Sequence, residues 1–418
     1  MDIKQSLDKL FSLHNFGIKL GLDNIRAFLD HIGNPEKSLK TFHIAGSNGK
    51  GSTSALIASI LIEAGYKVGL YTSPHFVRYN ERIIINGKYI EDEFVADFIN
   101  KHNEYIDKYG LTFFEVTTAM AFEYFKENKV DFAVIETGLG GRLDATNVLN
   151  PLACVITSIS LEHTNILGNK ISQIAFEKSE IIKPNCKVFI GKLSDEAEAV
   201  IEKKCNEVKA KLFPLEDYLI EKNDIVELYT EEIELQDWEI PLKGKYQRYN
   251  AALAVLTVTK TLDLDEPRIV YDGIKNVIKN TLIQGRYEYI RKQPFILLDS
   301  AHNPDGLKVF LGEFLQEKNK YPKVLLLFSA LMDKDIDSMI KLLQNNFDYY
   351  FITEINYERA TRLEDLKKHF DNFNIKAETI TDKRKFISDF LKGDKNNCLV
   401  VTGSMYLLGE VKAILEEL

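Results

Sequence analysis

The sequence predicts an α/β protein with two domains, each built around a parallel sheet. Short apolar runs of strand type alternate with longer runs of helical periodicity along most of the 418 residues. That length is sufficient for two hydrophobic cores. After Asn280 the composition changes, and a second series of alternating strands and helices begins. We therefore place the domain boundary near residue 283, with one domain at 1–283 and a smaller one at 284–418.

The composition narrows the possible functions before any motif is considered. Charged residues make up 28% of the chain and hydrophobic residues 45%, which is ordinary for a soluble globular protein. The net charge of −9 argues against nucleic-acid binding, which is usually accompanied by a basic excess. The four cysteines form no C-x-x-C pair and fit a reducing compartment. The sequence has no signal-like apolar core and no apolar run of spanning length, so we expect a cytoplasmic protein without membrane attachment.

The first elements of the chain are helices, followed by a strand and a glycine-rich loop. Residues 1–35 have apolar residues at helical spacing, and residues 41–45 form a short run of strand-forming residues. The loop 46–51 contains three glycines. A helix then opens from Ser52 and ends near Gly65.

This strand–loop–helix arrangement is typical of a phosphate-binding cradle. Glycines let backbone N–H groups turn toward an anion, and the helix N-terminus adds a favourable dipole. Lys50 can reach the terminal phosphates of a nucleotide, and the hydroxyl of Ser52 can hold Mg²⁺. We therefore expect a P-loop-type parallel-sheet ATPase domain. The residues predicted to bind ATP at this loop are Ser47, Asn48, Gly49, Lys50, Gly51 and Ser52.

The loop matches the G-x-x-x-x-G-K-[ST] pattern imperfectly. Ile44 stands at the position of the first glycine, and Gly51 follows Lys50 directly, which moves the hydroxyl to Ser52. The alternative is a plain glycine turn between a strand and a helix, as in any α/β protein. The strand and helix that flank the loop favour the cradle.

Further strands and helices of the first domain follow in alternation. The expected strands are 66–71, 132–136, 153–159 and 187–190, the expected helices are 91–109, 111–128, 170–183, 194–209 and 244–262, and residues 217–242 suggest a small antiparallel patch. Ligands bind at the carboxyl ends of strands in open α/β sheets, and three such ends carry charge: the cradle, Glu136 and His163. The glycines of 137–147 are not a dinucleotide fingerprint, because no helix-forming stretch follows at once.

The second domain is expected to be a smaller, Rossmann-like α/β domain. Its expected strands are 295–299, 324–328, 350–353 and 399–402, and its expected helices lie near 305–318, 334–346, 363–371 and 383–392. This βαβ series predicts a second parallel sheet.

Eight stretches resemble the Mur ligase superfamily, and within it the folylpolyglutamate synthases and the bifunctional dihydrofolate synthases. They run in family order across nearly the whole chain, and the glycine-rich stretch at 136–147 is the most specific. The stretches are AGSNGKGS (45–52), YTSPH (71–75), ETGLGGRLDATN (136–147), EHTNILG (162–168), EKSEIIKP (177–184), GRYE (285–288), DSAHNPD (299–305) and VTGSMY (401–406).

The resemblance implies an ATP-dependent ligase that adds L-glutamate to the carboxylate of a tetrahydrofolate through an acyl phosphate. ATP and Mg²⁺ are the implied cofactors, and we expect a monomer. The residues suit this chemistry independently, because a carboxylate is a poor electrophile that must be activated. Negative charge around the transferred phosphoryl group needs cations, which Lys50 and a metal would supply.

The resemblance also implies the metal ligands and the catalytic residues. Ser73, Glu136 and His163 are the implied Mg²⁺ ligands, with Ser52 near the metal linked to ATP. Lys178 matches the carbamylated lysine of the family. A structural histidine at a strand end is the alternative for His163, and a surface lysine beside Glu177 is the alternative for Lys178. The family usually has Lys-Ala-Gly where this chain has Lys-Ser-Glu, so the modification stays open. Together with Lys50 and Lys178, the third implied catalytic residue is His302.

The remaining nucleotide contacts are implied on both sides of the domain boundary. By resemblance Asn250 meets the adenine, Arg286 the phosphates and Asp299 the ribose side, so ATP would lie between the domains. Two departures from the family affect this region, since Ser300 replaces the usual glycine and Tyr246 the usual histidine.

The pterin side of the site is implied in the first domain. Its residues by resemblance are Thr72, Thr112, Leu143, Asp144 and Ala145. Phe113 and Phe114 are candidates for stacking on a pterin, although aromatic residues at helical spacing more often belong to a core.

Two readings of the function stay open beside the glutamate ligase. The enzyme could also glutamylate dihydropteroate, because both acceptors use one active site. A nucleotide-switch binding protein would share the cradle but would not need Arg286, Asp299 and Glu136 to converge. The segments DATN (144–147) and TSPH (72–75) argue against the cell-wall branch of the superfamily.

Overall fold

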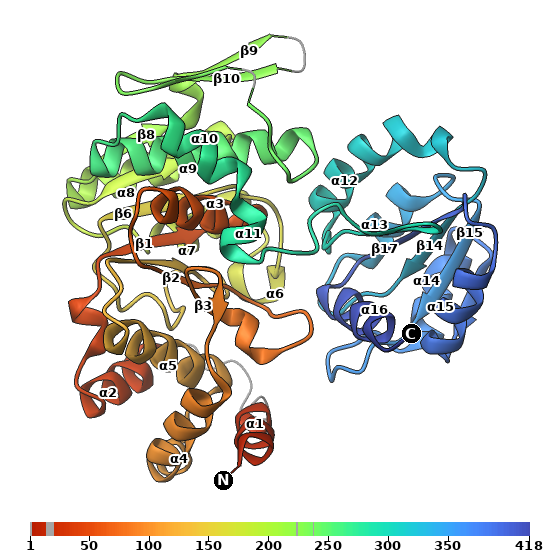
Figure 1. Cartoon of the computed structure of the whole chain (residues 1–418), viewed down its shortest axis with the longest axis horizontal. Coiled ribbons are helices and arrows are strands. Elements are labelled where there is room, and N and C mark those ends of the chain that lie inside the picture. Colours follow the sequence, from red (N-terminus) through yellow and green to blue (C-terminus); the bar gives the residue numbers. More distant parts are fainter. Residues whose placement is uncertain (1, 14–20, 223–224, 237) are drawn as a thin grey trace.

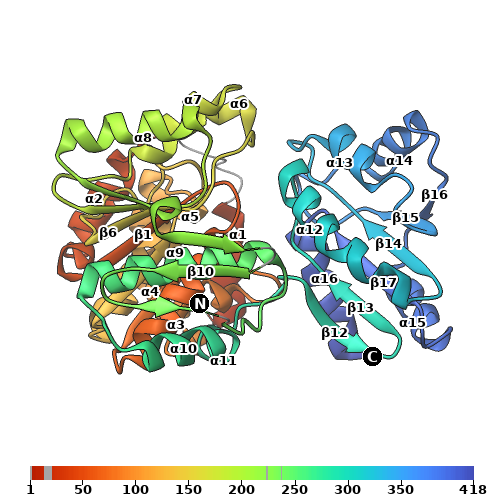
Figure 2. The same ribbon diagram turned by 90° about the horizontal axis from the view of Figure 1, so that it is seen from above.

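The computed structural model describes residues 2–13, 21–222, 225–236 and 238–418. Two lobes lie side by side, and each is built on its own sheet (Figures 1 and 2). The predicted α/β class with two sheets is confirmed. Part of the helical prediction for 1–35, namely residues 14–20, lies outside the described residues.

The first lobe contains an eight-stranded sheet whose order is β4-β3-β2-β5-β1-β6-β7-β8. Strands β1, β2, β5, β6, β7 and β8 run parallel to one another, and β3 and β4 add an antiparallel edge beside β2. The strands are β1 Thr41–Ala45, β2 Val68–Tyr71, β3 Ile83–Ile85, β4 Lys88–Tyr89, β5 Phe132–Glu136, β6 Ala153–Ile156, β7 Lys187–Ile190 and β8 Lys211–Pro214.

Helices cover both faces of this sheet. On one face α3 packs against α9, α10 and α11, and on the other face α5 lies with α1, α2 and α4. Strand β5 consists almost entirely of apolar residues because both of its faces are covered. The helices are α1 Ile3–Ser12, α2 Asp23–His31, α3 Lys50–Glu63, α4 Asp92–Tyr109, α5 Phe113–Glu127, α6 Thr164–Leu167, α7 Ile171–Ser179, α8 Asp195–Val208, α9 Lys245–Leu262, α10 Pro267–Lys275 and α11 Val277–Thr281.

A small three-stranded sheet lies at the edge of the first lobe (top of Figure 1). Its strands β9 Leu219–Lys222, β10 Ile225–Tyr229 and β11 Glu234–Leu235 pair in antiparallel fashion. The predicted antiparallel patch at 217–242 is therefore confirmed, apart from residues 223–224 and 237, which the structure does not describe.

The second lobe contains a six-stranded sheet with the order β12-β13-β17-β14-β15-β16. The four predicted strands are confirmed, and β12 and β16 complete the edges. Both edge strands are partly exposed, so they lack the buried apolar run that identifies a central strand. The elements are β12 Glu288–Lys292, β13 Phe295–Leu298, β14 Val324–Phe328, β15 Tyr349–Thr353, β16 Ala377–Ile380, β17 Cys398–Thr402, α12 Pro304–Glu317, α13 Ile336–Leu343, α14 Leu363–Asn372, α15 Lys383–Lys392 and α16 Met405–Glu417.

The register of the first sheet brings its charged strand ends together. Strand β1 lies between β5 and β6, with Ile44 opposite Glu136 and Ala45 opposite Ile156. The loops that leave these three strands therefore start at the same edge of the sheet. Among the described residues, no helix is both long enough and apolar enough to cross a membrane.

Candidate active site between the two sheet domains

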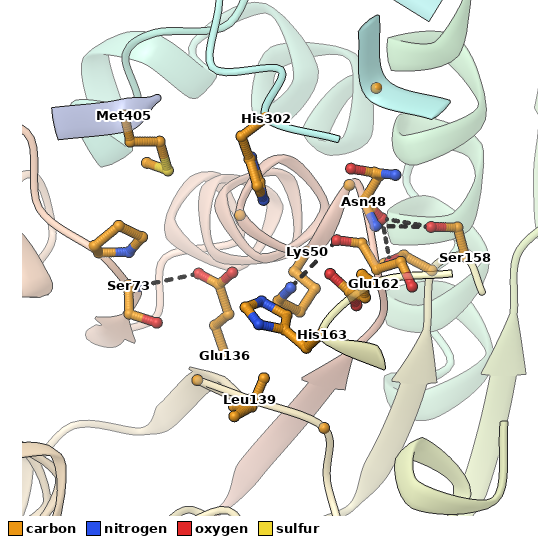
Figure 3. A pocket seen from close by; sticks show the side chains of 18 of the residues that line it. Asn48, Lys50, Ser73, Glu136, Leu139, Ser158, Glu162, His163, His302 and Met405 are labelled. Carbon is orange, nitrogen blue, oxygen red and sulfur yellow. Dashed lines mark hydrogen bonds between the residues drawn. The ribbon is translucent and has the colours of Figure 1, made fainter. Parts of the chain in front are cut away.

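A cavity of about 1020 Å³ lies between the lobes and is lined by residues of both. Figure 3 shows Lys50, Glu136, His163 and His302 around this common space. Of the residues that the sequence analysis assigns to the site, the cavity is lined by Ser47, Asn48, Gly49, Lys50, Gly51, Ser52, Ser73, Thr112, Glu136, Leu143, Asp144, Ala145, His163, Lys178, Asn250, Arg286, Asp299 and His302.

Thr72 is the exception: it does not line this cavity, and its predicted role in substrate binding stays a prediction. It lines a small adjoining cavity instead. The Thr72 N–H donates to the carbonyl of Arg82 at 3.0 Å, which extends the pairing of β2 with β3 by one residue. Side chains alternate along extended backbone, so Ser73 rather than Thr72 faces the main cavity.

The loop between β1 and α3 is held in place by the loop that follows β6. Ser47 N–H donates to the carbonyl of Ser158 at 2.8 Å, and Asn48 N–H donates to the Ser158 hydroxyl at 2.9 Å. The Thr157 hydroxyl donates to the Asn48 carbonyl at 2.6 Å. Gly46 is required here because its φ is 153° and a Cβ would lie 1.9 Å from Thr157 Oγ1. The cradle is thus formed by bonds within the first lobe.

The start of α3 points its N–H groups at the cavity and supplies one cation. Helix α3 begins at Lys50, whose ammonium donates to the Gly46 carbonyl at 2.9 Å. Arg286 approaches from the second lobe, with its Nη2 3.1 Å from where a Cβ on Gly51 would lie. The glycine loop, the helix N-terminus and these two cations fit a triphosphate.

Glu136 supplies a carboxylate that is fully inside the molecule. Its Oε2 accepts the Ser73 N–H at 3.2 Å. Burial raises the pKa of this carboxyl, and Lys50 and Arg286 oppose that shift. Among the described residues, no cluster of three or more His, Cys, Asp or Glu side chains could hold a metal ion. One carboxylate with the hydroxyls of Ser52 and Ser73 nevertheless fits Mg²⁺, which binds oxygen ligands and keeps several waters.

His163 faces charged partners from the second lobe. Its Nδ1 lies 3.2 Å from Asp333 Oδ2, and its Nε2 lies 3.2 Å from the Lys334 ammonium. Both ring nitrogens are therefore occupied by contacts across the cleft. A metal ligand role for His163 requires one of these contacts to be released.

Lys178 is buried, which rules out a plain surface lysine. Its ammonium donates to Glu162 Oε1 at 2.7 Å, and only 1% of the residue is exposed. Its sequence neighbour Glu177 pairs with Arg142 instead. Burial lowers the pKa of the Lys178 ammonium. Burial would raise the pKa of Glu162, but Lys178 and Lys50 outweigh it and hold the pKa of that carboxyl well below its usual range.

The end of β13 brings two titratable groups to the second wall of the cavity. Asp299 accepts the N–H groups of Tyr287 and Ala301, each at 2.9 Å, and burial raises the pKa of Asp299 to about 6. The His302 Nδ1 lies 2.9 Å from the Ser300 carbonyl, which can only accept, so Nδ1 carries the proton. Burial lowers the pKa of His302 to about 4. His302 is therefore neutral at pH 7, with a free lone pair on Nε2.

The remaining predicted contacts line the cradle and the glycine-rich loop. Asn250 lies against the cradle, with its Oδ1 2.6 Å from where a Cβ on Gly49 would stand. Thr112 caps α5, and its hydroxyl donates to Glu115. The ring of Phe113 stacks on Phe11, as a core residue would, and also lines the cavity.

Asp144 lines the cavity, but its carboxylate is used by its own loop. Its Oδ2 accepts the N–H groups of Gly138 and Leu139, each at 2.8 Å. Its Oδ1 accepts the N–H and the hydroxyl of Thr146. Asp144 thus shapes the wall of the site, and its predicted contact with the substrate stays a prediction.

The comparisons with known proteins agree with this geometry. The Mur ligase middle domain matches residues 44–258, and the Mur ligase glutamate ligase domain matches residues 285–405. The chain belongs to the Mur ligase family. It is similar to the dihydrofolate synthase/folylpolyglutamate synthase of Bacillus subtilis, with 36% identity over 95% of both chains.

Solved structures of this Mur ligase branch have the same fold. The folylpolyglutamate synthase of Mycobacterium tuberculosis, complexed with ADP and AMPPCP, has 28% identity and a TM-score of 0.88 over 99% of both chains. The bifunctional folylpolyglutamate synthase/dihydrofolate synthase of Yersinia pestis, with Mn, AMPPNP and L-glutamate bound, has 26% identity and a TM-score of 0.86. It covers all of this chain, which covers 98% of it. This Mur ligase is accordingly an ATP-dependent ligase.

Several residues of the Mur ligase site were not assigned from the sequence. Arg82 is 5% exposed, lines the cavity and lies over the Phe113 ring at 5.0 Å. Glu162 and Lys334 are the others. Arg82 lies in a segment rich in charged residues, and Glu162 directly precedes the predicted ligand His163. Both could therefore have been predicted as site residues from their neighbours. Lys334 could not, because it follows a strand of the second lobe and meets the site only through folding.

Proposed function

We propose that this Mur ligase joins L-glutamate to the carboxylate of a folate, with ATP as the source of energy. The observation that carries the proposal is the single cavity that contains Lys50 and Glu136 from one lobe and Arg286 and His302 from the other. A nucleotide switch would not need these groups to converge around one reacting carboxylate.

The proposed reaction has two steps. The acceptor carboxylate attacks the γ-phosphorus of ATP, which forms an acyl phosphate and releases ADP. The amine of glutamate then attacks the acyl carbon, an amide forms, and phosphate leaves. Lys50 and Arg286 stabilise the charge on the transferred phosphoryl group. Glu136, with the hydroxyls of Ser52 and Ser73, would hold Mg²⁺, which would neutralise phosphate charge.

His302 is suited to receive the proton that the attacking amine must lose. Its Nδ1–H is fixed by the Ser300 carbonyl, so its Nε2 is the free acceptor. Because burial lowers the pKa of His302 to about 4, the ring starts the reaction neutral at pH 7.

Lys178 remains the proposed position of a carbamate. Burial lowers the pKa of its ammonium, which increases the fraction of neutral amine that can react with CO₂ and release a proton. The bond to Glu162 at 2.7 Å opposes the modification, because a carbamate at Lys178 and the Glu162 carboxylate would be two anions facing each other. A ¹³C signal from bound carbamate after incubation with ¹³CO₂, lost in Lys178→Arg, tests this assignment.

The acceptor is proposed to be a tetrahydrofolate, and dihydropteroate is the second candidate. The Bacillus subtilis relative carries both activities in its name, which favours a bifunctional enzyme. We further propose a domain boundary at residue 283, a monomer and a cytoplasmic location. Asn250 and Asp299 would bind the adenosine part of ATP, and Thr112, Leu143 and Ala145 would line the acceptor side.

Product analysis by mass spectrometry tests the function directly. The enzyme is incubated with ATP, Mg²⁺ and L-glutamate, together with tetrahydrofolate or, separately, with dihydropteroate. A mass increase of one glutamyl unit, with ADP release that needs all components, supports the proposal. ATP hydrolysis that is independent of glutamate would instead support the nucleotide switch.

A further inference from the structure

His43 lies beneath the active site and does not line its cavity. It occupies the middle of β1, between β5 and β6, and its side chain is completely buried. A histidine at the centre of a buried parallel strand is unusual, because such strands are otherwise apolar. Its side chain therefore needs a hydrogen-bonding reason to be there.

The hydrogen bonds around His43 fix its tautomer. The His43 Nε2 lies 2.8 Å from the Thr146 hydroxyl oxygen. That hydroxyl donates its only hydrogen to Asp144 Oδ1. Asp144 receives four donors in all, as an ionised carboxylate would. The Thr146 oxygen must therefore accept from His43, so the proton of the ring is on Nε2.

The surroundings keep His43 neutral in this tautomer. Burial, with Lys183 as a further cause, lowers the pKa of His43 to about 3. Its Nδ1 is buried and has no hydrogen-bond partner among the described residues, so no acceptor there would stabilise a proton on Nδ1. The ring is thus a permanent donor at Nε2 across the working pH range of an enzyme.

The chain of bonds that starts at His43 ends in the wall of the cavity. The Thr146 hydroxyl donates to Asp144, and Asp144 accepts the N–H groups of Gly138 and Leu139 at 2.8 Å each. Gly138, Leu139 and Asp144 all line the cavity. The first of these bonds joins the buried strand β1 to the loop 137–147, and the next two lead within the loop to the N–H groups of Gly138 and Leu139.

We propose that His43 is a positioning residue that fixes this loop through Thr146 and Asp144. As a neutral Nε2–H donor, it sets the Thr146 hydroxyl so that its hydrogen must point at Asp144. The carboxylate is then held in the one orientation in which it binds the two loop N–H groups. The identity of the substrate affected, the folate acceptor, rests on the proposed function, whereas the effect on the loop does not.

Two substitutions at His43 distinguish the effect of its hydrogen-bond donor from the effect of its side-chain volume. In His43→Gln, the side-chain amide can place an N–H close to the position of Nε2, whereas His43→Leu fills the space without a donor. His102→Leu is the matched control, because His102 is also buried but lies on α4 against Phe28 and Phe98, away from the loop.

The first readout is amide hydrogen exchange of residues 137–147, measured by mass spectrometry on the full chain. A hydrogen bond to a charged network is worth about 1.5–3 kcal/mol, so His43→Leu is expected to speed exchange of this loop about tenfold or more. His43→Gln is expected to restore most of the protection, and His102→Leu to leave the loop unchanged. Unchanged exchange in folded His43→Leu, or equal loss in His43→Gln and His43→Leu, overturns the proposal.

The second readout is the KM for each substrate. We expect His43→Leu to raise the KM for the folate acceptor while the KM for ATP stays within about twofold, and His43→Gln to behave like the wild type. If loop exchange rises but the acceptor KM does not, the positioning role stands and the acceptor side of the proposed function fails.

A third measurement needs no substitution. The ¹⁵N shifts of His43 in the wild-type protein report which ring nitrogen carries the proton. Protonated Nε2 with bare Nδ1 supports the proposal even if His43→Leu does not fold. A charged ring or the opposite tautomer overturns it.

Discussion

The two walls of the cavity are held in different ways. In the first lobe, the cradle and the glycine-rich loop are fixed by bonds inside that lobe, through Ser158 and Asp144. In the second lobe, several side chains of the wall find their partners across the cleft. Asn303 donates to Asn48 at 3.0 Å, and Lys334 contacts His163. The first wall is therefore preformed, whereas the second is completed only when the lobes are close.

Because of this difference, phosphate can bind to the first wall before the rest of the site is complete. The cradle needs only the first lobe to be folded. Arg286 and His302 reach the reacting groups only if the second lobe approaches, so we expect domain closure to accompany catalysis. We expect the largest effects from changes in the preformed wall, and smaller effects from changes in the second wall and in the contacts between the walls.

The largest effect is expected for Lys50→Ala, which removes the cation of the preformed wall. Loss of a cation that stabilises a transferring phosphoryl group lowers kcat by about 10³-fold or more. Initial rates of ADP release at saturating ATP measure the effect. Lys192→Ala is the control, because Lys192 also lines the cavity but pairs with the partly exposed Glu221. Near-normal kcat in Lys50→Ala would contradict its role.

Lys178→Met is expected to be the most destabilising of these changes. It leaves Glu162 buried without its partner, which costs about 3–5 kcal/mol in the free energy of unfolding. Urea denaturation measures the loss. In the matched control Lys204→Met, the pair with Glu180 is partly exposed, and a loss of about 1 kcal/mol or less is expected. Equal losses in both variants would show that burial of the pair does not matter.

Asp299 at the second wall should make the free energy of unfolding depend on pH. Its pKa is about 6 when folded, against 3.8 for an ordinary aspartate, so between these values the folded state keeps a proton that the unfolded state has lost. Stability from this group is therefore lost as pH rises from about 4 to about 6, by about 3 kcal/mol in total.

Asp299→Asn removes that slope. The variant also loses one acceptor for the N–H groups of Tyr287 and Ala301, but this cost of about 1–3 kcal/mol is the same at every pH. Unfolding free energies at pH 4 and pH 7 are compared between the two proteins. An identical pH dependence in the wild type and the variant would mean that Asp299 is not perturbed.

The smallest effect is expected for Asn303→Ser, which cuts a contact between the walls. Asn303 also caps α12 by accepting the Gly306 N–H at 2.7 Å, and serine is an equally good cap but too short to reach Asn48. We expect an unchanged melting temperature, a KM for ATP raised about threefold, and less compaction on AMPPNP binding in X-ray scattering. Asp335→Ser, which changes the cap of α13, is the control. If Asn303→Ser became as compact as the wild type on AMPPNP binding, the contact between Asn303 and Asn48 would not contribute to domain closure.

The sequence was sufficient to predict most strands and helices of the first lobe. Strands β1, β5 and β7 and helix α4 were predicted to within a residue, because short runs of strand-forming or apolar residues mark buried strands and the helix has clear end signals. Edge strands such as β12 and β16 were missed, since half-exposed strands carry no such run.

The sequence also determined which functional groups the site contains, because residue type and spacing are local properties. The glycine loop with Lys50, the carboxylate of Glu136 and the family motifs by themselves indicate a nucleotide-dependent ligase. Residue identity alone determined which functional groups were available.

Which partner each group finds was decided only by the tertiary structure. Lys178 is buried against Glu162 rather than paired with its neighbour Glu177, and Asp144 is occupied by its own loop. Thr72 lies outside the main cavity, and Lys334 enters the site from a distant strand end. Burial, orientation and partners far apart in the chain depend on how the sheets pack, and no local pattern of residues encodes that.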